Sequence, residues 1–154
     1  MGQRTHADTI YPRPMRRIVL DSNCLLMCLA PRSPYHKVWQ DFLDCKVEWC
    51  VTTEILSEYA EILERKTSAW FAETVVNTIV NNESTIRVSP TYFFTVIQAD
   101  PDDNKFVDCA VCGNAEFIVS NDTHFKVLKE IVFPRVKVLR IEEFMAECSE
   151  NLDS

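Results

Sequence analysis

The sequence predicts an α/β fold, a three-layer sandwich in which helices cover both faces of a central, mostly parallel sheet of about five strands. Short apolar runs typical of buried parallel strands recur along the 154 residues. Segments with helical spacing of apolar residues separate these runs, as the connections between parallel strands require. A chain of this length can bury a core as one domain. We expect that domain over residues 16–148, between a polar N-terminal extension (residues 1–15) and a C-terminal tail (residues 149–154).

The expected elements alternate along the chain. Strands are predicted over residues 17–21, 47–51, 84–88, 116–120 and 136–139. Helices are predicted over residues 35–45, 53–66, 69–81, 103–112, 122–129 and 141–148, with a further apolar segment over 24–29. In such sheets ligands bind beyond the carboxyl ends of the strands, where the strand order reverses. Functional residues are therefore expected directly after the strands.

The composition is that of a soluble globular protein. No apolar run approaches the roughly 18–20 residues of a membrane span, and the first residues lack the apolar core of a signal peptide. A cytoplasmic protein is therefore expected, with no membrane partner. The net charge of −7 weakens the expectation of nucleic-acid binding. Acids concentrated in one metal-filled cleft with a basic rim can nevertheless hold a phosphate backbone.

The seven cysteines do not form a recognisable disulfide or zinc pattern. Their number is odd, and they lie inside apolar runs. Cys109 and Cys112 have ligand spacing, but no second pair completes a four-ligand zinc site. We expect buried, reduced cysteines that act as small hydrophobic residues.

Four acidic residues fall where the predicted sheet would bring them together. Asp21 ends the first strand, Glu58 lies inside the helix after the second, Asp103 opens the helix before the fourth, and Asp122 follows that strand. Carboxylate oxygens are ligands that Mg²⁺ and Mn²⁺ prefer, whereas several carboxylates without a cation repel each other. A bound ion lowers the pKa of a water and offsets charge on an attacked phosphodiester. A divalent metal site is therefore predicted.

Other interpretations of these acids stay open on spacing alone. Asp21, Asp103 and Asp122 could each cap a helix, and Glu58 could be a solvated helix residue. Spacing also does not select Asp103 over its acidic neighbours Asp100, Asp102 and Asp108.

Four segments, in order, resemble the motifs of PIN domains. Residues 18–23 (IVLDSN) resemble the first motif, a strand that ends in Asp followed by Ser or Thr and Asn. Residues 54–63 (EILSEYAEIL) resemble the second, residues 100–110 (DPDDNKFVDCA) the third, and residues 117–125 (FIVSNDTHF) the fourth. The resemblance spans roughly residues 16–145 and is nearest to PIN-family toxin components of bacterial toxin–antitoxin systems.

This resemblance implies an enzyme, a Mg²⁺- or Mn²⁺-dependent endoribonuclease that cleaves single-stranded RNA. It also implies a homodimer and an inhibitory antitoxin protein. The residues in register with the family's catalytic metal site are Asp21, Glu58, Asp103 and Asp122, with Glu58 binding the metal directly or through water.

Several neighbouring residues could support the metal site. Ser22 and Ser120 replace the commoner Thr and keep a hydroxyl for hydrogen bonds. Ser22 and Asn23 would orient Asp21 or hold water and phosphate oxygens. Asp108 would either support the site or face solvent.

The interpretation of the nearby basic residues is also open. Lys105 would contact phosphate or be an ordinary surface lysine, and His124 would be a general acid or a structural or solvent-facing residue. RNA contacts are further possible from Tyr35, His36 and Lys37.

A function of another class is a catalytically idle PIN fold that serves as an RNA-binding or scaffold module. It predicts loss of one or more carboxylates, and all four are present. A phosphoryl-acceptor receiver domain would usually have a Lys after its last strand, where this chain has Leu139 and Arg140. The sequence does not match a phosphatase of the Asp-x-Asp-x-Thr type, because Asn23 stands where that motif has its second Asp.

Overall fold

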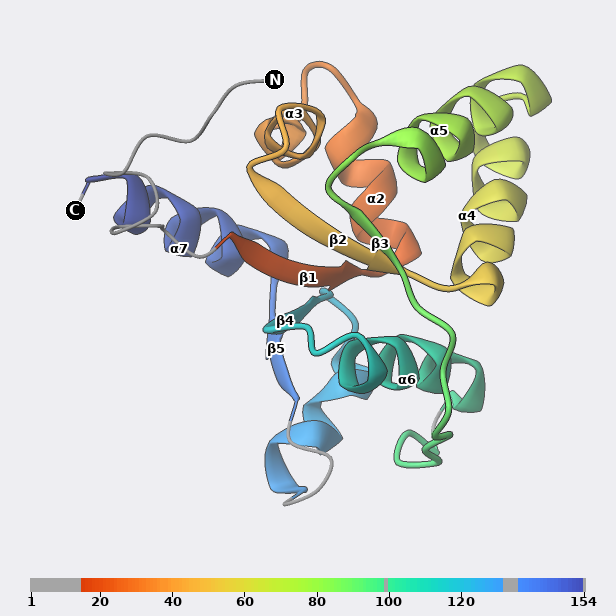
Figure 1. Ribbon diagram of the computed structural model, residues 1–154, viewed down its shortest axis with the longest axis vertical. Coiled ribbons are helices and arrows are strands. Elements are labelled where there is room, and N and C mark those ends of the chain that lie inside the picture. Colours follow the sequence, from red (N-terminus) through yellow and green to blue (C-terminus); the bar gives the residue numbers. More distant parts are fainter. Residues whose placement is uncertain (1–14, 99, 132–135, 154) are drawn as a thin grey trace.

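The computed structural model describes residues 15–98, 100–131 and 136–153. It confirms the predicted sandwich: five strands form one sheet in the order β3-β2-β1-β4-β5, and every neighbouring pair is parallel. Helices lie on both sides of this sheet, with α3 and α6 on opposite sides (Figure 1). The strands are β1 (Arg16–Leu20), β2 (Val47–Val51), β3 (Thr85–Arg87), β4 (Phe117–Val119) and β5 (Lys137–Leu139).

The strand order reverses beside β1. The chain runs outward from β1 through β2 to β3, then returns to the other side of β1 for β4 and β5. Ligands bind at such reversal points in parallel sheets. The residues that follow β1 and β4 therefore occupy the position where a functional site is expected.

Three of the helices begin with a side-chain cap. Asp21, Thr52 and Ser68 accept hydrogen bonds from backbone N–H groups three residues on, which satisfies donors that a helix start leaves unpaired. The helices are α2 (Ser22–Leu29), α3 (His36–Leu43), α4 (Thr53–Lys66), α5 (Ala69–Asn81), α6 (Asn104–Cys112) and α7 (Ile141–Asp153). Two 3₁₀ helices complete the described chain, η1 (Pro101–Asp103) and η2 (Thr123–Glu130).

An aromatic cluster holds α4 against the sheet. Trp49 of β2 lies with its ring centroid 4.7 Å from that of Phe42 and 6.1 Å from that of Tyr59. The Trp49 indole donates to the Tyr59 hydroxyl at 3.3 Å, and that hydroxyl donates to the carbonyl of Leu20 at the end of β1. Tyr59 follows Glu58 directly, so this contact fixes Glu58 near the carboxyl end of β1.

The cysteines are unpaired. Four of them are buried as expected, whereas Cys45, Cys112 and Cys148 are only half-buried. Burial raises the pKa of Cys28 to about 12 and those of Cys50 and Cys148 to about 11, so these thiols stay protonated at neutral pH. Among the described residues, no helix combines the length and apolar character that crossing a membrane requires.

Some element boundaries differ from the predicted ones. The apolar segment over 24–29 belongs to a full helix that begins at Ser22, and the segment predicted as a helix over 122–129 is the 3₁₀ helix η2. The last helix continues to Asp153, so residues 149–153, expected as a tail, extend α7. Of the expected N-terminal extension, residues 1–14 lie outside the described residues.

Gly113 ends α6 for a packing reason. The left-handed conformation at this helix end belongs to Asn114, with φ 54°, whereas Gly113 has an ordinary φ of −89°. A Cβ on Gly113 would lie 2.8 Å from Val88 Cγ2 and 2.9 Å from the backbone oxygen of Cys109. Glycine therefore permits the close approach of the α6 end to the chain after β3.

We expect Gly113→Ala to lower the free energy of unfolding by about 1–3 kcal/mol, because the new methyl group overpacks the interior. Urea denaturation followed by circular dichroism measures the change. Asn114→Gly is the matched control and should change stability far less, since glycine adopts a positive φ freely. Equal stability of Gly113→Ala and the wild-type protein would contradict this packing.

Candidate active site

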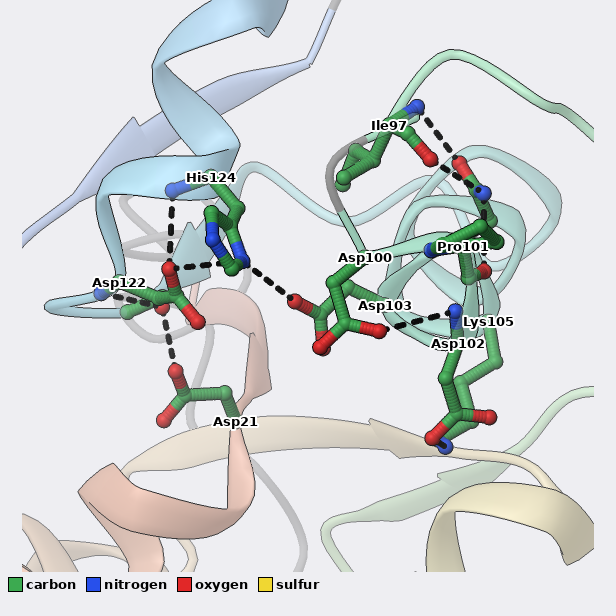
Figure 2. Close-up of polar contacts among 11 residues, drawn as sticks. Asp21, Ile97, Asp100, Pro101, Asp102, Asp103, Lys105, Asp122 and His124 are labelled. Atoms are coloured by element: carbon green, nitrogen blue, oxygen red, sulfur yellow. Dashed lines mark hydrogen bonds and ion pairs between the residues drawn. The ribbon is translucent and has the colours of Figure 1, made fainter.

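The predicted acidic residues gather at the reversal point of the sheet. Asp21 follows β1 and Asp122 follows β4, while α4 and the η1–α6 segment bring Glu58 and Asp103 to the same edge. Burial is the main cause of the raised pKa of both Asp103 and Asp21. The negative charge of Asp122 contributes at both residues, and those of Asp100 and Glu58 contribute at Asp103. Figure 2 shows Asp21, Asp103 and Asp122 around one region, with Asp100 and His124 beside them.

Asp21 both caps a helix and faces this region. One carboxylate oxygen accepts from the backbone N–H of Cys24 at 2.8 Å, and the other accepts from the Ser120 hydroxyl. Its burial raises its pKa, whereas these two hydrogen bonds favour the charged form. The capping and metal-site interpretations of Asp21 are thus compatible.

Ser120 connects the first strand to the fourth. Its buried hydroxyl donates to Asp21 and accepts from the backbone N–H of Asp122 at 3.0 Å. Asp122 in turn accepts from the backbone N–H of His124 at 2.8 Å, which begins η2. The Ser120 hydroxyl therefore fixes the relative position of two of the predicted carboxylates.

Both carboxylate oxygens of Glu58 have partners. One accepts from the Ser22 hydroxyl, and the other lies 2.6 Å from Lys105 Nζ. Lys105 Nζ also lies 2.7 Å from Asp102, and only 11% of the Lys105 side chain is exposed. Glu58 is therefore no solvated helix residue, and Lys105 is no ordinary surface lysine.

His124 lies between two of the acids. Its Nδ1 is 3.3 Å from Asp122 Oδ1 and 3.7 Å from Asp103 Oδ2. That Nδ1 and Asp103 Oδ2 are buried, and neither makes a hydrogen bond to the described residues. Asp100, Asp103 and His124 each offer an atom that could bind a metal, and these three atoms lie within 4.8 Å of one another.

Burial and neighbouring negative charges raise the pKa of Asp103. Desolvation is the largest cause, followed by the negative charges of Asp100, Asp122 and Glu58, and together they raise its pKa to about 6. A carboxylate in such surroundings gains most from a nearby cation.

A cavity beside Asp122 is lined by more basic than acidic side chains. It measures about 120 Å³, and its charged lining residues are Asp122, Glu143, Lys126, Lys129 and Arg140. These three cationic side chains, here called the basic groove, are exposed. A protein with a net charge of −7 thus places cations beside Asp122, one of the four carboxylates Asp21, Glu58, Asp103 and Asp122 here called the acid cluster.

Comparison with known proteins identifies the family. The PIN-domain family profile matches residues 17–124, a range that includes all four predicted carboxylates. This chain belongs to the PIN-domain family. A search of curated proteins finds no match.

Solved structures share the fold of this PIN domain. VapBC2 from Rickettsia felis, bound to a DNA fragment from its promoter, matches with a TM-score of 0.56 at 13% identity, over 80% of this chain and 98% of that chain. The PIN domain of T. brucei RRP44 matches with a TM-score of 0.50 at 12% identity, over 90% of this chain and 84% of that chain.

The residues of this PIN domain fit a divalent cation. The acid cluster supplies carboxylate oxygens, the ligand type that Mg²⁺ and Mn²⁺ prefer. Asp103 Oδ2 is buried without a hydrogen bond, so a cation there would give it a partner. Spacing along the sequence did not decide between Asp100 and Asp103 as a metal ligand. A ligand role for His124 could have been suggested by its position in the fourth motif.

The expected supporting residues divide into two groups. Ser120 contacts Asp21, whereas the Ser22 hydroxyl, expected to orient Asp21, donates to Glu58 instead. Asn23 is exposed. Asp108 points elsewhere, because it accepts from the backbone N–H of Phe94 at 2.7 Å.

The polar atoms of the segment after α2 have partners within the protein. His36 Nδ1 lies 2.8 Å from the carbonyl oxygen of Cys28, and Lys37 pairs with Asp41 at 3.0 Å. Tyr35 is partly buried and packs against the core. The structure therefore does not add support for RNA contacts from these residues.

Proposed function

We propose that this PIN domain is a divalent-metal-dependent endoribonuclease that hydrolyses phosphodiester bonds of single-stranded RNA. The observation that carries the proposal is the convergence of Asp21, Asp103 and Asp122 where the strand order reverses, with a buried oxygen of Asp103 left without a hydrogen bond. PIN domains are generally nucleases, which agrees with this assignment.

Asp21, Asp103 and Asp122 would hold Mg²⁺ or Mn²⁺, and Glu58 would bind it directly or through water. Asp100 and His124 could add ligands beside Asp103, since the ligand atoms of these three residues lie within 4.8 Å of one another. The ion, when bound, supplies a water of lowered pKa and offsets charge on the attacked phosphate.

The chain's own residues prepare this site. The Cys24 N–H and the Ser120 hydroxyl hold Asp21 in one orientation and favour its charged form despite burial. The Ser22 hydroxyl orients Glu58, while the Lys105 ammonium offsets the charge of Glu58 and Asp102. Fixed partners of this kind keep the ligands in position before substrate arrives.

We further propose a toxin–antitoxin role with a protein antitoxin as partner and a homodimeric assembly. The fold likeness to VapBC2 supports this role, together with the motif resemblance. Growth arrest on expression that a neighbouring gene relieves would support it, and normal growth at high expression would contradict it.

RNA cleavage tests the proposed activity. End-labelled single-stranded RNA, including tRNA, is incubated with the purified protein in Mn²⁺, in Mg²⁺ or with EDTA. We expect internal cleavage with Mn²⁺ and none with EDTA. Intact RNA in both metals would instead favour the idle binding module.

The basic groove is expected to bind the RNA backbone. The double change Lys126→Glu and Lys129→Glu should weaken binding of a single-stranded RNA about tenfold or more at low salt. It should also reduce the slope of log Kd against log salt by about 1.4, because each phosphate contact on a single strand contributes roughly 0.7. Fluorescence anisotropy in EDTA measures both quantities.

The matched control is Lys46→Glu with Lys66→Glu, which changes the net charge equally at exposed lysines outside the groove. This control should retain most of the affinity and salt slope. Equal weakening by the two double variants would mean that net charge alone, and not the groove, governs binding.

A further inference from the structure

A second cavity lies beside the acid cluster. It has a volume of about 210 Å³. The start of α4 contributes Thr53 and Glu54, α6 contributes Lys105 and Asp108, and the segment after β3 contributes Phe93. Lys105 also pairs with Glu58, so one side chain separates this cavity from the candidate catalytic carboxylates.

The segment after β3, here called the strap (residues 88–98), has no helix or strand, and α6 holds it in place. Asp108 accepts from the backbone N–H of Phe94 at 2.7 Å. Asn104, 8% exposed, accepts from the Ile97 N–H at 2.9 Å and donates to the Ile97 carbonyl at 3.0 Å, contacts drawn in Figure 2. These three hydrogen bonds give the strap a defined position over α6.

The strap presents an aromatic ring to solvent at the cavity. Phe93 lines the cavity although 73% of it is exposed, and its neighbour Tyr92 is 68% exposed. Aromatic side chains in this situation are stacking surfaces for unpaired bases, since every base has a π-face.

The charge of the cavity favours a base over a phosphate. Its lining holds two carboxylates, those of Glu54 and Asp108, and one ammonium, that of Lys105, which already pairs with Glu58 and Asp102. The two carboxylates repel an anionic phosphate. Carboxylates accept hydrogen bonds from base N–H groups, however. Guanine presents two adjacent donors on its Watson–Crick edge, at N1 and N2, and both can face one carboxylate.

The size of the cavity agrees with one base. Its volume of about 210 Å³ is several times the roughly 30 Å³ that a water molecule occupies in the liquid. It is below the roughly 300–1,000 Å³ of pockets that enclose whole drug-sized ligands.

We propose that this cavity binds one unpaired base of the RNA substrate, with guanine preferred, by stacking on Phe93 and by hydrogen bonds to Glu54. The inference rests on the proposed function for the identity of the substrate. The RNA would then contact the basic groove on the Asp122 side and this cavity on the Glu58 side, with the acid cluster between them.

Binding without cleavage tests the inference separately from the activity. Fluorescein-labelled hexaribonucleotides that carry G, A, C or U at one position in an otherwise uridine sequence are titrated against the full-length protein in EDTA. We expect the guanine probe to bind most tightly and Phe93→Ala to raise its Kd on the order of tenfold, from the loss of base stacking. Glu54→Gln should reduce the preference for guanine over uracil, because an amide replaces one acceptor oxygen with a donor.

Matched controls keep the outcome decisive. Trp70→Ala removes an aromatic residue that is also 73% exposed but lies on α5 outside the cavity, and Glu61→Gln changes an exposed acid on the same helix as Glu54. Both should bind the four probes like the wild-type protein.

Unchanged guanine affinity in Phe93→Ala, equal affinity of the wild-type protein for all four probes, or no binding of any probe would each overturn the inference. A protein segment would then become the candidate occupant of the cavity. Metal-dependent cleavage that persists beside such a result would leave the proposed function intact. Phe93-dependent binding without cleavage in any metal would support the cavity and contradict the nuclease.

Discussion

Asp21→Asn is expected to slow cleavage of single-stranded RNA in Mn²⁺ on the order of a hundredfold to a thousandfold, the range found when one electrostatic contributor to a reaction is removed. The neutral amide has one fewer anionic oxygen for a cation at the centre of the acid cluster. Initial rates on an end-labelled RNA at saturating Mn²⁺ measure the loss.

The structure makes Asn the informative substitution at this position. The side-chain oxygen of Asn can still accept from the Cys24 N–H, so the cap of α2 is retained. Circular dichroism and the thermal midpoint should therefore stay close to those of the wild-type protein. A matched control is Asp44→Asn, which neutralises an exposed acid after α3 and should cleave normally. Full activity of Asp21→Asn would remove Asp21 from the site.

Mn²⁺ is expected to stabilise the wild-type protein strongly. At a free concentration one hundred times its Kd, a ligand specific for the folded state adds about 2.7 kcal/mol. For a chain of this size that corresponds to a rise in Tm of roughly 5–10 °C. Differential scanning calorimetry in EDTA and in Mn²⁺ measures the difference. No change in Tm with Mn²⁺ would contradict a metal site in the folded protein.

Asp103→Asn should raise the stability of the metal-free protein and reduce its stabilisation by Mn²⁺. Without metal, the charged Asp103 is unfavourable because it is desolvated and lies near Asp100 and Asp122. The variant is therefore expected to be more stable than the wild-type protein in EDTA at pH 7, on the order of 1 kcal/mol once solvent screening is allowed for. In Mn²⁺ it should lose most of the metal-induced gain. Lower stability of the variant in EDTA would contradict the repulsion described here.

The same carboxyl group gives the metal-free protein a pH dependence. The pKa of Asp103 in the folded state is about 6, above the ordinary value of 3.8, so the folded state binds the proton more tightly than the unfolded state. The resulting stabilisation is complete below about pH 4 and is lost as the pH rises through 6. Calorimetry in EDTA between pH 4 and 8 should show this loss in the wild-type protein and a smaller one in Asp103→Asn.

Much of the fold follows from patterns that one sequence displays. Buried parallel strands have continuous apolar runs, which is why residues 47–51 were predicted with the bounds that β2 has. The caps at Thr52 and Ser68 set the starts of α4 and α5 in the same local way. The helix over 122–129 was predicted less well, because apolar spacing does not separate a 3₁₀ helix from an α-helix.

The contacts of the site were harder to predict from the sequence than the fold. Strand-end position was enough to place Asp21 and Asp122 at the same edge of the sheet, because the carboxyl ends of neighbouring parallel strands meet there. The Lys105–Glu58 pair joins residues 47 positions apart, and the contact of His124 with Asp103 depends on how η2 lies beside η1. The contact between Asp108 and the backbone of Phe94 was equally unpredictable, because Phe94 lies in the strap, which has no periodic pattern of apolar residues.

The position of a bound metal ion decides whether these carboxylates form a metal site. Anomalous diffraction from crystals grown with Mn²⁺ shows where the metal lies without reference to activity. We expect a strong peak within bonding distance of carboxylate oxygens of Asp21, Asp103 and Asp122, at the carboxyl ends of β1 and β4. A well-ordered site without a peak there, or Mn²⁺ bound only to acids elsewhere on the surface, would contradict it.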